Sequence, residues 1–159
     1  MTTPWVHLSR YVSHGKNIGG NNATKVSNTP NSFPSCLCFY LTAETDSVTN
    51  GLSYFIAGML EGFNSTARER YVVIHGSDYA TKNFIDRLGR LGRSLGCPAV
   101  PAKLSKEIIN TIKGKSGLLI YSEDKNSLQK STYMNALAVL FSCNLVYIFR
   151  FRSYKSIPR

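Results

Sequence analysis

The sequence predicts an α/β fold, in the form of a three-layer α/β/α sandwich around a mixed sheet of about four strands. Segments with apolar residues at helical spacing alternate with short β-branched runs, and this alternation is typical of a sheet covered by helices on both faces. The chain has 159 residues, of which 43% are hydrophobic. That length is enough for one buried core and too short for two ordinary domains. The expected order is helix, strand, helix, short strand, helix, strand, helix, strand.

Residues 1–35 are expected to form a flexible N-terminal arm, and residues 36–159 the folded domain. The arm is rich in Asn, Ser, Thr, Gly and Pro, a composition that offers little apolar surface to bury. It also contains a small apolar cluster, which docks either on a partner or on the domain itself: Trp5, Val6, Leu8, Tyr11 and Val12.

A first helix is expected over residues 52–62, with Asn50 as its N-cap and Gly62 as its stop. Its apolar residues recur at helical spacing: Leu52, Phe55, Ile56, Met59 and Leu60. After it, the β-branched run Tyr71–Ile74 is bounded by polar residues, which predicts a strand buried on both faces.

Apolar spacing over residues 84–95 predicts a second helix, whose outward positions carry a basic stripe of Arg87, Arg90 and Arg93. Gly89 and Gly92 each weaken this helix by about 1 kcal/mol relative to Ala, so close packing against a neighbour is expected to compensate. A third helix is expected over residues 104–112, with Ser105 as a cap, after the stretch Cys97–Pro101.

Two more strands and a helix complete the expected domain. Residues Gly117–Tyr121 form a buried strand, and residues 128–141 a fourth helix. Residues 145–154 alternate as a strand does, with Tyr147, Phe149 and Phe151 on one side and Arg150 and Arg152 on the other.

A net charge of +10 makes a nucleic acid the leading partner, because cationic side chains lower the free energy of approaching a polyanion. The sequence has no apolar run near the roughly 20 residues that span a bilayer, so no membrane partner is expected. The sequence has four cysteines, Cys36, Cys38, Cys97 and Cys143, and they lack the paired spacing of a zinc site. We therefore expect buried free thiols in a reducing intracellular compartment, with no metal and no cofactor.

Catalysis has one candidate position. His75, Ser77 and Asp78 lie at the end of a predicted strand, where open α/β sheets place ligands. Adjacent residues on an extended segment splay apart, so a polar turn with Ser77 or Asp78 as a cap is favoured over a nucleophilic site. The stretch Gly114-Lys115-Ser116 resembles the end of a P-loop, but Ile109 stands where such a loop needs glycine. The acidic pairs Glu44/Asp46 and Glu123/Asp124 have no nearby metal ligands.

Two strings resemble a known family. Gly51–Gly62 is similar to the helix with which the kink-turn RNA-binding superfamily of ribosomal protein L-seven-A-e begins its RNA site, and Ser53, Tyr54 and Ala57 stand at its contact positions. Cys97–Ser105 resembles the proline-containing stretch of a divergent branch, the subunit of nuclear RNase P and RNase MRP called Pop-three in yeasts and Rpp-thirty-eight in animals. Residues 111–115 fall where that family has its apolar RNA-binding loop.

The resemblance implies a non-catalytic, RNA-binding subunit of a ribonucleoprotein endoribonuclease that processes precursor tRNA and rRNA in the nucleus and nucleolus. Its partners would be structured RNA and other protein subunits, with no small-molecule substrate. The residues expected to contact RNA are Gly51, Leu52, Ser53, Tyr54, Ala57, Arg87, Arg90, Lys103, Ile112, Lys113 and Lys115.

Three alternatives stay open at this point. The first is a small α/β enzyme with its site at His75–Asp78. The second is a protein-interaction subunit whose positive charge only aids solubility. The third is another ribosomal or snoRNP protein of the kink-turn superfamily.

Overall fold

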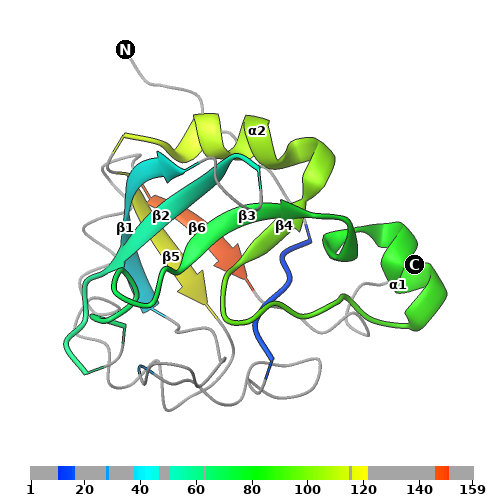
Figure 1. Cartoon of the computed structure of the whole chain (residues 1–159), viewed down its shortest axis with the longest axis horizontal. Coiled ribbons are helices and arrows are strands. Elements are labelled where there is room, and N and C mark those ends of the chain that lie inside the picture. The colour runs from blue at the N-terminus through cyan, green and yellow to red at the C-terminus, as the bar shows by residue number, and fades with distance from the viewer. Residues whose placement is uncertain are drawn as a thin grey trace.

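A computed structural model describes residues 11–16, 28, 38–46, 51–62, 64–114, 116–121 and 146–150. Its centre is a six-stranded mixed sheet in the order β4-β3-β2-β1-β5-β6, curled around the core (Figure 1). The strands are β1 Cys38–Asp46, β2 Ser53–Gly58, β3 Val73–Ser77, β4 Ala99–Pro101, β5 Gly117–Tyr121 and β6 Val146–Arg150.

Strand direction divides the sheet into a centre and two edges. In the centre, β1 pairs antiparallel with both β2 and β5, and β2 pairs antiparallel with β3. At the edges, β3 pairs with β4 and β5 pairs with β6, both in parallel. A parallel pair needs a crossover connection, so each edge joins segments that are far apart in sequence.

The helix α2, Ala102–Ile112, packs on β3 (Figure 1). Its residues Ile108, Ile109 and Ile112 are buried in the main core together with Tyr54 and Ile56 of β2. Burying such aliphatic side chains stabilises the fold by about 1.5–3 kcal/mol each. The predicted helix over residues 104–112 is therefore confirmed. Ser105 does not cap it, because Ser105 Oγ donates within the helix to the Ala102 carbonyl at 2.8 Å.

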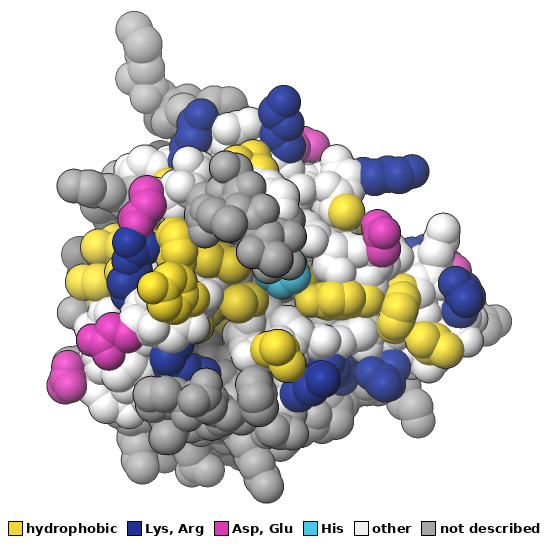
Figure 2. Space-filling view, viewed as in Figure 1, with side chains coloured by type: hydrophobic (Ala, Val, Ile, Leu, Met, Phe, Trp, Pro, Cys, Tyr) yellow, Lys and Arg dark blue, Asp and Glu magenta, His cyan; other side chains and the backbone are white. Residues whose placement is uncertain are grey.

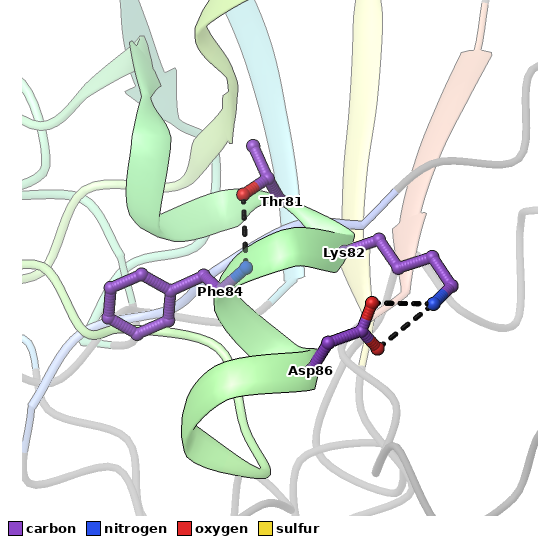
Figure 3. Close-up of polar contacts among 4 residues, drawn as sticks. All are labelled: Thr81, Lys82, Phe84 and Asp86. Carbon is purple, nitrogen blue, oxygen red and sulfur yellow. Dashed lines mark hydrogen bonds and ion pairs between the residues drawn. The ribbon is translucent and has the colours of Figure 1, made fainter.

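The helix α1, Lys82–Leu88, follows the short 3-10 helix η1, Asp78–Ala80. Thr81 Oγ1 accepts a hydrogen bond from the Phe84 N–H at 3.4 Å, and the Lys82 ammonium contacts both Asp86 carboxylate oxygens, at 2.7 and 2.9 Å (Figure 3). Gly89 ends α1 with a φ of 68°, a left-handed conformation that glycine adopts readily.

The predicted helix over residues 84–95 is thus only partly correct, because α1 ends at Leu88. Beyond it, residues 90–95 are not helical, and Gly92 N–H donates to the Tyr79 carbonyl at 3.0 Å instead of to a helical neighbour. The basic stripe of Arg87, Arg90 and Arg93 therefore does not lie on one helix.

The predicted helix over residues 52–62 is wrong. Residues Ser53–Gly58 form β2, in which Tyr54 and Ile56 are buried whereas Phe55 and Ala57 are more exposed. This is a period of two residues, imposed by pairing with β1 on one side and β3 on the other. Sheet pairing overrides the helical spacing of the apolar residues.

Residues 11–16 run beside β4. Ser13 forms an antiparallel bridge with Ala99 and Gly15 a parallel bridge with Ser94. Val12 belongs to the main core, so part of the apolar cluster near the N-terminus packs on the domain.

The α/β class is confirmed, but the three-layer sandwich with about four strands is wrong. The described residues form a sheet of six strands, and β1 at its centre was not predicted at all. The strands expected at Tyr71–Ile74, Gly117–Tyr121 and residues 145–154 are present as β3, β5 and β6. The helix expected over residues 128–141 lies outside the described residues. Among the described helices, none is both long and apolar enough for a membrane span.

Candidate active site

The parallel pair β3–β4 brings a histidine and a cysteine to neighbouring places. His75 is in register with Ala99, and Gly76 with Val100. The His75 N–H donates to the carbonyl of Pro98 at 3.2 Å. Since Pro98 directly follows Cys97, the backbone of His75 lies one residue away from that of Cys97, across the strand pair.

Ser94 shapes the turn that carries Cys97. Its buried hydroxyl accepts a hydrogen bond from the Gly96 N–H at 3.1 Å and donates to the Cys97 carbonyl at 2.5 Å. Gly96 has a φ of 124°, where an L side chain would be strained. The turn from Ser94 to Cys97 is therefore closed by one side chain and depends on one glycine.

The thiol of Cys97 is free and partly exposed. It donates to the Tyr71 carbonyl, with a sulfur-to-oxygen distance of 3.8 Å. Burial raises the pKa of the Cys97 thiol, while a hydrogen bond from the Val73 backbone and the charge of Arg70 partly oppose that rise. The thiol is consequently protonated at neutral pH, and it needs a base to become a nucleophilic thiolate.

The imidazole of His75 has the properties of such a base. Burial lowers its pKa below the ordinary value of 6.5, and the contact with the Gly76 carbonyl only partly opposes this. Its Nδ1 lies 3.2 Å from that carbonyl oxygen, a position in which Nδ1–H donates. The ring is then neutral at pH 7, and Nε2 keeps a lone pair that can accept a proton.

Tyr79 contacts His75 and lies within electrostatic range of Cys97. Its ring meets that of His75 edge-on, with the centroids 6.4 Å apart. Burial raises the pKa of the Tyr79 phenol, a hydrogen bond with the Ser77 side chain partly opposes the rise, and the charge of Cys97 adds to it, so the phenol stays protonated. Gly92 leaves the space that Tyr79 needs, because a Cβ at Gly92 would lie 2.5 Å from the Tyr79 Cβ.

The face drawn in Figure 2 shows a histidine side chain at the surface between groups of hydrophobic side chains. Lys and Arg side chains lie at several places around this face, interspersed with Asp and Glu, and do not form one continuous basic patch. Within the described ranges, no group of three or more His, Cys, Asp and Glu residues is placed to hold a metal ion. The site offers two groups for chemistry, the thiol of Cys97 and the neutral imidazole of His75, on segments that the β3–β4 pairing brings together.

A cysteine with a histidine base defines the class of nucleophilic acyl-transfer sites, in which sulfur attacks a carbonyl carbon. Residues 1–121, of the 159 in the chain, match the family model YkuD_2, described as the L,D-transpeptidase catalytic domain. The chain belongs to this family. Comparison with curated proteins and with solved structures gives no significant match.

The family assignment overturns the predicted resemblance to the kink-turn superfamily and the RNase P and RNase MRP subunit. The expectation of a non-catalytic protein is wrong, because the family is one of catalytic domains. The predictions of RNA and ribonucleoprotein subunits as partners, of no small-molecule substrate, of tRNA and rRNA processing, and of a nuclear and nucleolar location are wrong with it. The alternative of a small α/β enzyme, which named His75, is closer to the finding.

The residues expected to contact RNA do not form one surface. Ser53, Tyr54 and Ile112 are buried, and the Tyr54 hydroxyl accepts a hydrogen bond from the Gly114 N–H at 2.9 Å. Gly51 and Leu52 precede β2 and Ala57 lies on it, not on a helix. The exposed residues of the set are Gly51 before β2 and Arg87, Arg90, Lys103 and Lys113, which lie on or after α1 and α2. Lys115 lies outside the described residues.

His75 could be singled out from its place at a strand end, whereas nothing in the sequence singled out Cys97. Ser77 and Asp78, named beside His75, belong to a cap: Ser77 Oγ accepts from the Tyr79 N–H at 3.4 Å and begins η1. Cys97 was interpreted as a buried free thiol. Cys97 follows a glycine in the turn before a short strand, but only the parallel β3–β4 register places that turn beside His75.

Proposed function

We propose that this chain is a cysteine acyltransferase of the L,D-transpeptidase type, with Cys97 as nucleophile and His75 as general base. The observation that carries the proposal is the β3–β4 register, in which the His75 N–H bonds the carbonyl next to Cys97. The substrate class follows from the family, whose description names a transpeptidase between L- and D-centres. We take it to be the peptide of bacterial cell-wall peptidoglycan.

In the first half-reaction, the Cys97 sulfur attacks the carbonyl carbon of the donor peptide bond, while His75 Nε2 takes the thiol proton. The carbonyl oxygen becomes negatively charged in the tetrahedral intermediate. The protonated phenol of Tyr79 is the donor proposed to stabilise that charge. When the intermediate collapses, the C–N bond breaks, His75 gives its proton to the leaving amine, and a thioester remains on Cys97.

In the second half-reaction, the amine of an acceptor attacks the thioester carbon. His75 takes a proton from this amine and returns it to the sulfur as the C–S bond breaks. A new peptide bond forms and Cys97 is again a thiol. Attack by water in place of the amine would give hydrolysis. The net charge of +10 favours approach to an acidic polymer, which is consistent with a charged cell-wall substrate.

The test is an exchange assay with the purified full chain, a peptidoglycan stem peptide as donor and a D-amino acid as acceptor, with products identified by mass spectrometry. Wild type is expected to form the exchanged peptide, and Cys97→Ala to form none. The matched control is Cys143→Ala, which removes another cysteine and is expected to retain exchange. Exchange by Cys97→Ala at the wild-type rate would exclude the proposal.

A further inference from the structure

A segment near the N-terminus is hydrogen-bonded to the turn that carries Cys97. The Ser13 N–H donates to the Ala99 carbonyl at 2.8 Å, and the Ala99 N–H donates back to Ser13 at 2.9 Å. The Ser94 N–H donates to the His14 carbonyl at 3.1 Å, and the Lys16 N–H donates to the Ser94 carbonyl at 2.9 Å. Both backbone polar groups of Ser94 are thus held by this segment, while its side chain holds Gly96 and Cys97.

The side chain of Ser13 reaches a second part of the site. Ser13 is fully buried, and its hydroxyl donates to the Gly92 carbonyl. The Gly92 N–H donates in turn to the Tyr79 carbonyl at 3.0 Å, and Gly92 packs directly against the Tyr79 side chain. Strand pairing alone does not require a hydroxyl at position 13, and burying one is costly unless it is hydrogen-bonded. The bond to Gly92 is therefore the specific contribution of the serine.

Building on the proposed function, we infer that Ser13 is a positioning residue of the acyl-transfer site, which fixes the start of the Gly92–Cys97 segment relative to Tyr79 and His75. It touches neither Cys97 nor Tyr79 in the contacts described here and acts through Gly92 and the paired backbone of Ala99 and Ser94. Displacing a reacting group by about 1 Å can lower a rate by about a hundredfold. The Ser13 hydroxyl, which holds the first residue of the Gly92–Cys97 segment in place, therefore affects the rate of acyl transfer more than it affects substrate binding.

The experiment compares Ser13→Ala with Thr42→Val in the full chain. Thr42 is a matched control, because it is a buried hydroxyl that donates to the Ile112 carbonyl at 2.9 Å and lies on β1, away from β4. Two quantities are measured: kcat and KM in the exchange assay, and the pH midpoint of Cys97 alkylation by iodoacetamide. Alkylation is followed on the tryptic peptide of residues 94–103, in which Cys97 is the one cysteine.

We expect Ser13→Ala to lower kcat on the order of tenfold with little change in KM. The alkylation midpoint should fall toward the free-thiol value of about 8.5, because a loosened turn exposes Cys97. Thr42→Val should leave both quantities near wild type. If Ser13→Ala does not fold, Ser13→Cys retains a side-chain donor, weaker and slightly larger than the hydroxyl, and should show the same changes to a smaller degree.

Equal effects of Ser13→Ala and Thr42→Val on both measurements would overturn the inference, as would a change confined to KM. The alkylation measurement needs no substrate, so it separates this inference from the proposed function. A shifted midpoint in a protein without exchange activity would support the positioning role and count against transpeptidation.

Discussion

Two histidine–glycine pairs lie against the same segment of chain, and we propose different roles for their histidines. His75 bonds the Pro98 carbonyl through its backbone N–H, and His14 accepts from the Ser94 N–H through its backbone carbonyl. Each ring places Nδ1 near the carbonyl of the following glycine, at 3.2 Å for His75 and 3.0 Å for His14. Local chemistry alone therefore does not distinguish them.

Their surroundings do distinguish them. His14 is 4% exposed, and burial lowers its pKa to about 4, with the charge of Arg93 adding to the effect. His75 is also buried, at 8% exposed, but its ring meets that of Tyr79 and its backbone N–H bonds the carbonyl next to the partly exposed Cys97. A buried histidine whose pKa lies far below neutrality is suited to a structural role, whereas one that strand pairing brings near a cysteine is suited to proton transfer. The role proposed for each histidine therefore follows from the side chains that surround it in the folded sheet.

Replacing the histidines one at a time gives the largest expected contrast. His75→Ala removes the base and should lower kcat/KM by a factor of about 10²–10⁴. His14→Gln should lower it far less per folded molecule, because the backbone carbonyl that bonds Ser94 remains. Exchange kinetics, normalised to the folded fraction from circular dichroism, measure both. Similar losses in the two variants would contradict the assignment of different roles.

The next largest expected effect is a loss of stability in acid, caused by protonation of His14. Its pKa is about 4 when folded and 6.5 when unfolded, so the unfolded state binds more protons between these values. Stability from the neutral ring is complete above pH 6.5 and is lost as the pH falls toward 4, in total about 3 kcal/mol. Urea unfolding at pH 7 and pH 4 should show a loss of stability about 3 kcal/mol larger in wild type than in His14→Gln, because the lowered pKa of His75 contributes in both proteins. An equal loss in both proteins would refute it.

Ser94 connects the segment of His14 to the turn that carries Cys97, and replacing it should have a smaller effect than the histidine substitutions. Ser94→Ala removes the bonds to Gly96 and Cys97 but keeps the backbone bonds to residues 14 and 16. We expect the free energy of unfolding to fall by about 2 kcal/mol and kcat by about tenfold. Thr111→Ala, which removes a hydroxyl bonded within α2, is the control for stability. Unchanged kcat in Ser94→Ala would show that the turn does not depend on this hydroxyl.

The smallest expected effect is a displacement of the pH–activity profile. Burial lowers the pKa of His75, and the neutral ring is the active base, so activity is present above that pKa and is lost as the pH falls through it. The acid limb of kcat/KM should therefore have its midpoint below 6.5. A midpoint above this value would mean that His75 is not the base, or that it works as an imidazolium.

Some elements on both sides of the sheet could be predicted from the sequence. The segments Gly117–Tyr121 and 104–112 have lengths and apolar patterns that fit a single type of element, and both are confirmed as β5 and α2. Residues 52–62 have spacings that suit either type, and the pairing of β2 with β1 and β3 decided between them. β1 was overlooked, although its alternation of Cys38, Tyr40 and Thr42 is of the strand type.

The site was less predictable, for a physical reason. A histidine at a strand end could be found from its position, and His75 was. Its partner depends on which segment lies beside β3 and in which register, and parallel pairing of β3 with residues 99–101 is not specified by any local pattern. The net charge of +10 was misleading, because charge describes the class of ligand and leaves the chemistry open.

Trapping of the acyl-enzyme tests the pairing of Cys97 with His75 most directly. The full chain is mixed with a stem-peptide donor in the absence of acceptor, quenched in acid and digested, and the peptide of residues 94–103 is weighed by mass spectrometry. Wild type should carry the acyl group on Cys97, and His75→Ala should accumulate it at least about a hundredfold more slowly. An acyl group on another residue, or equal rates in the two proteins, would contradict the pairing.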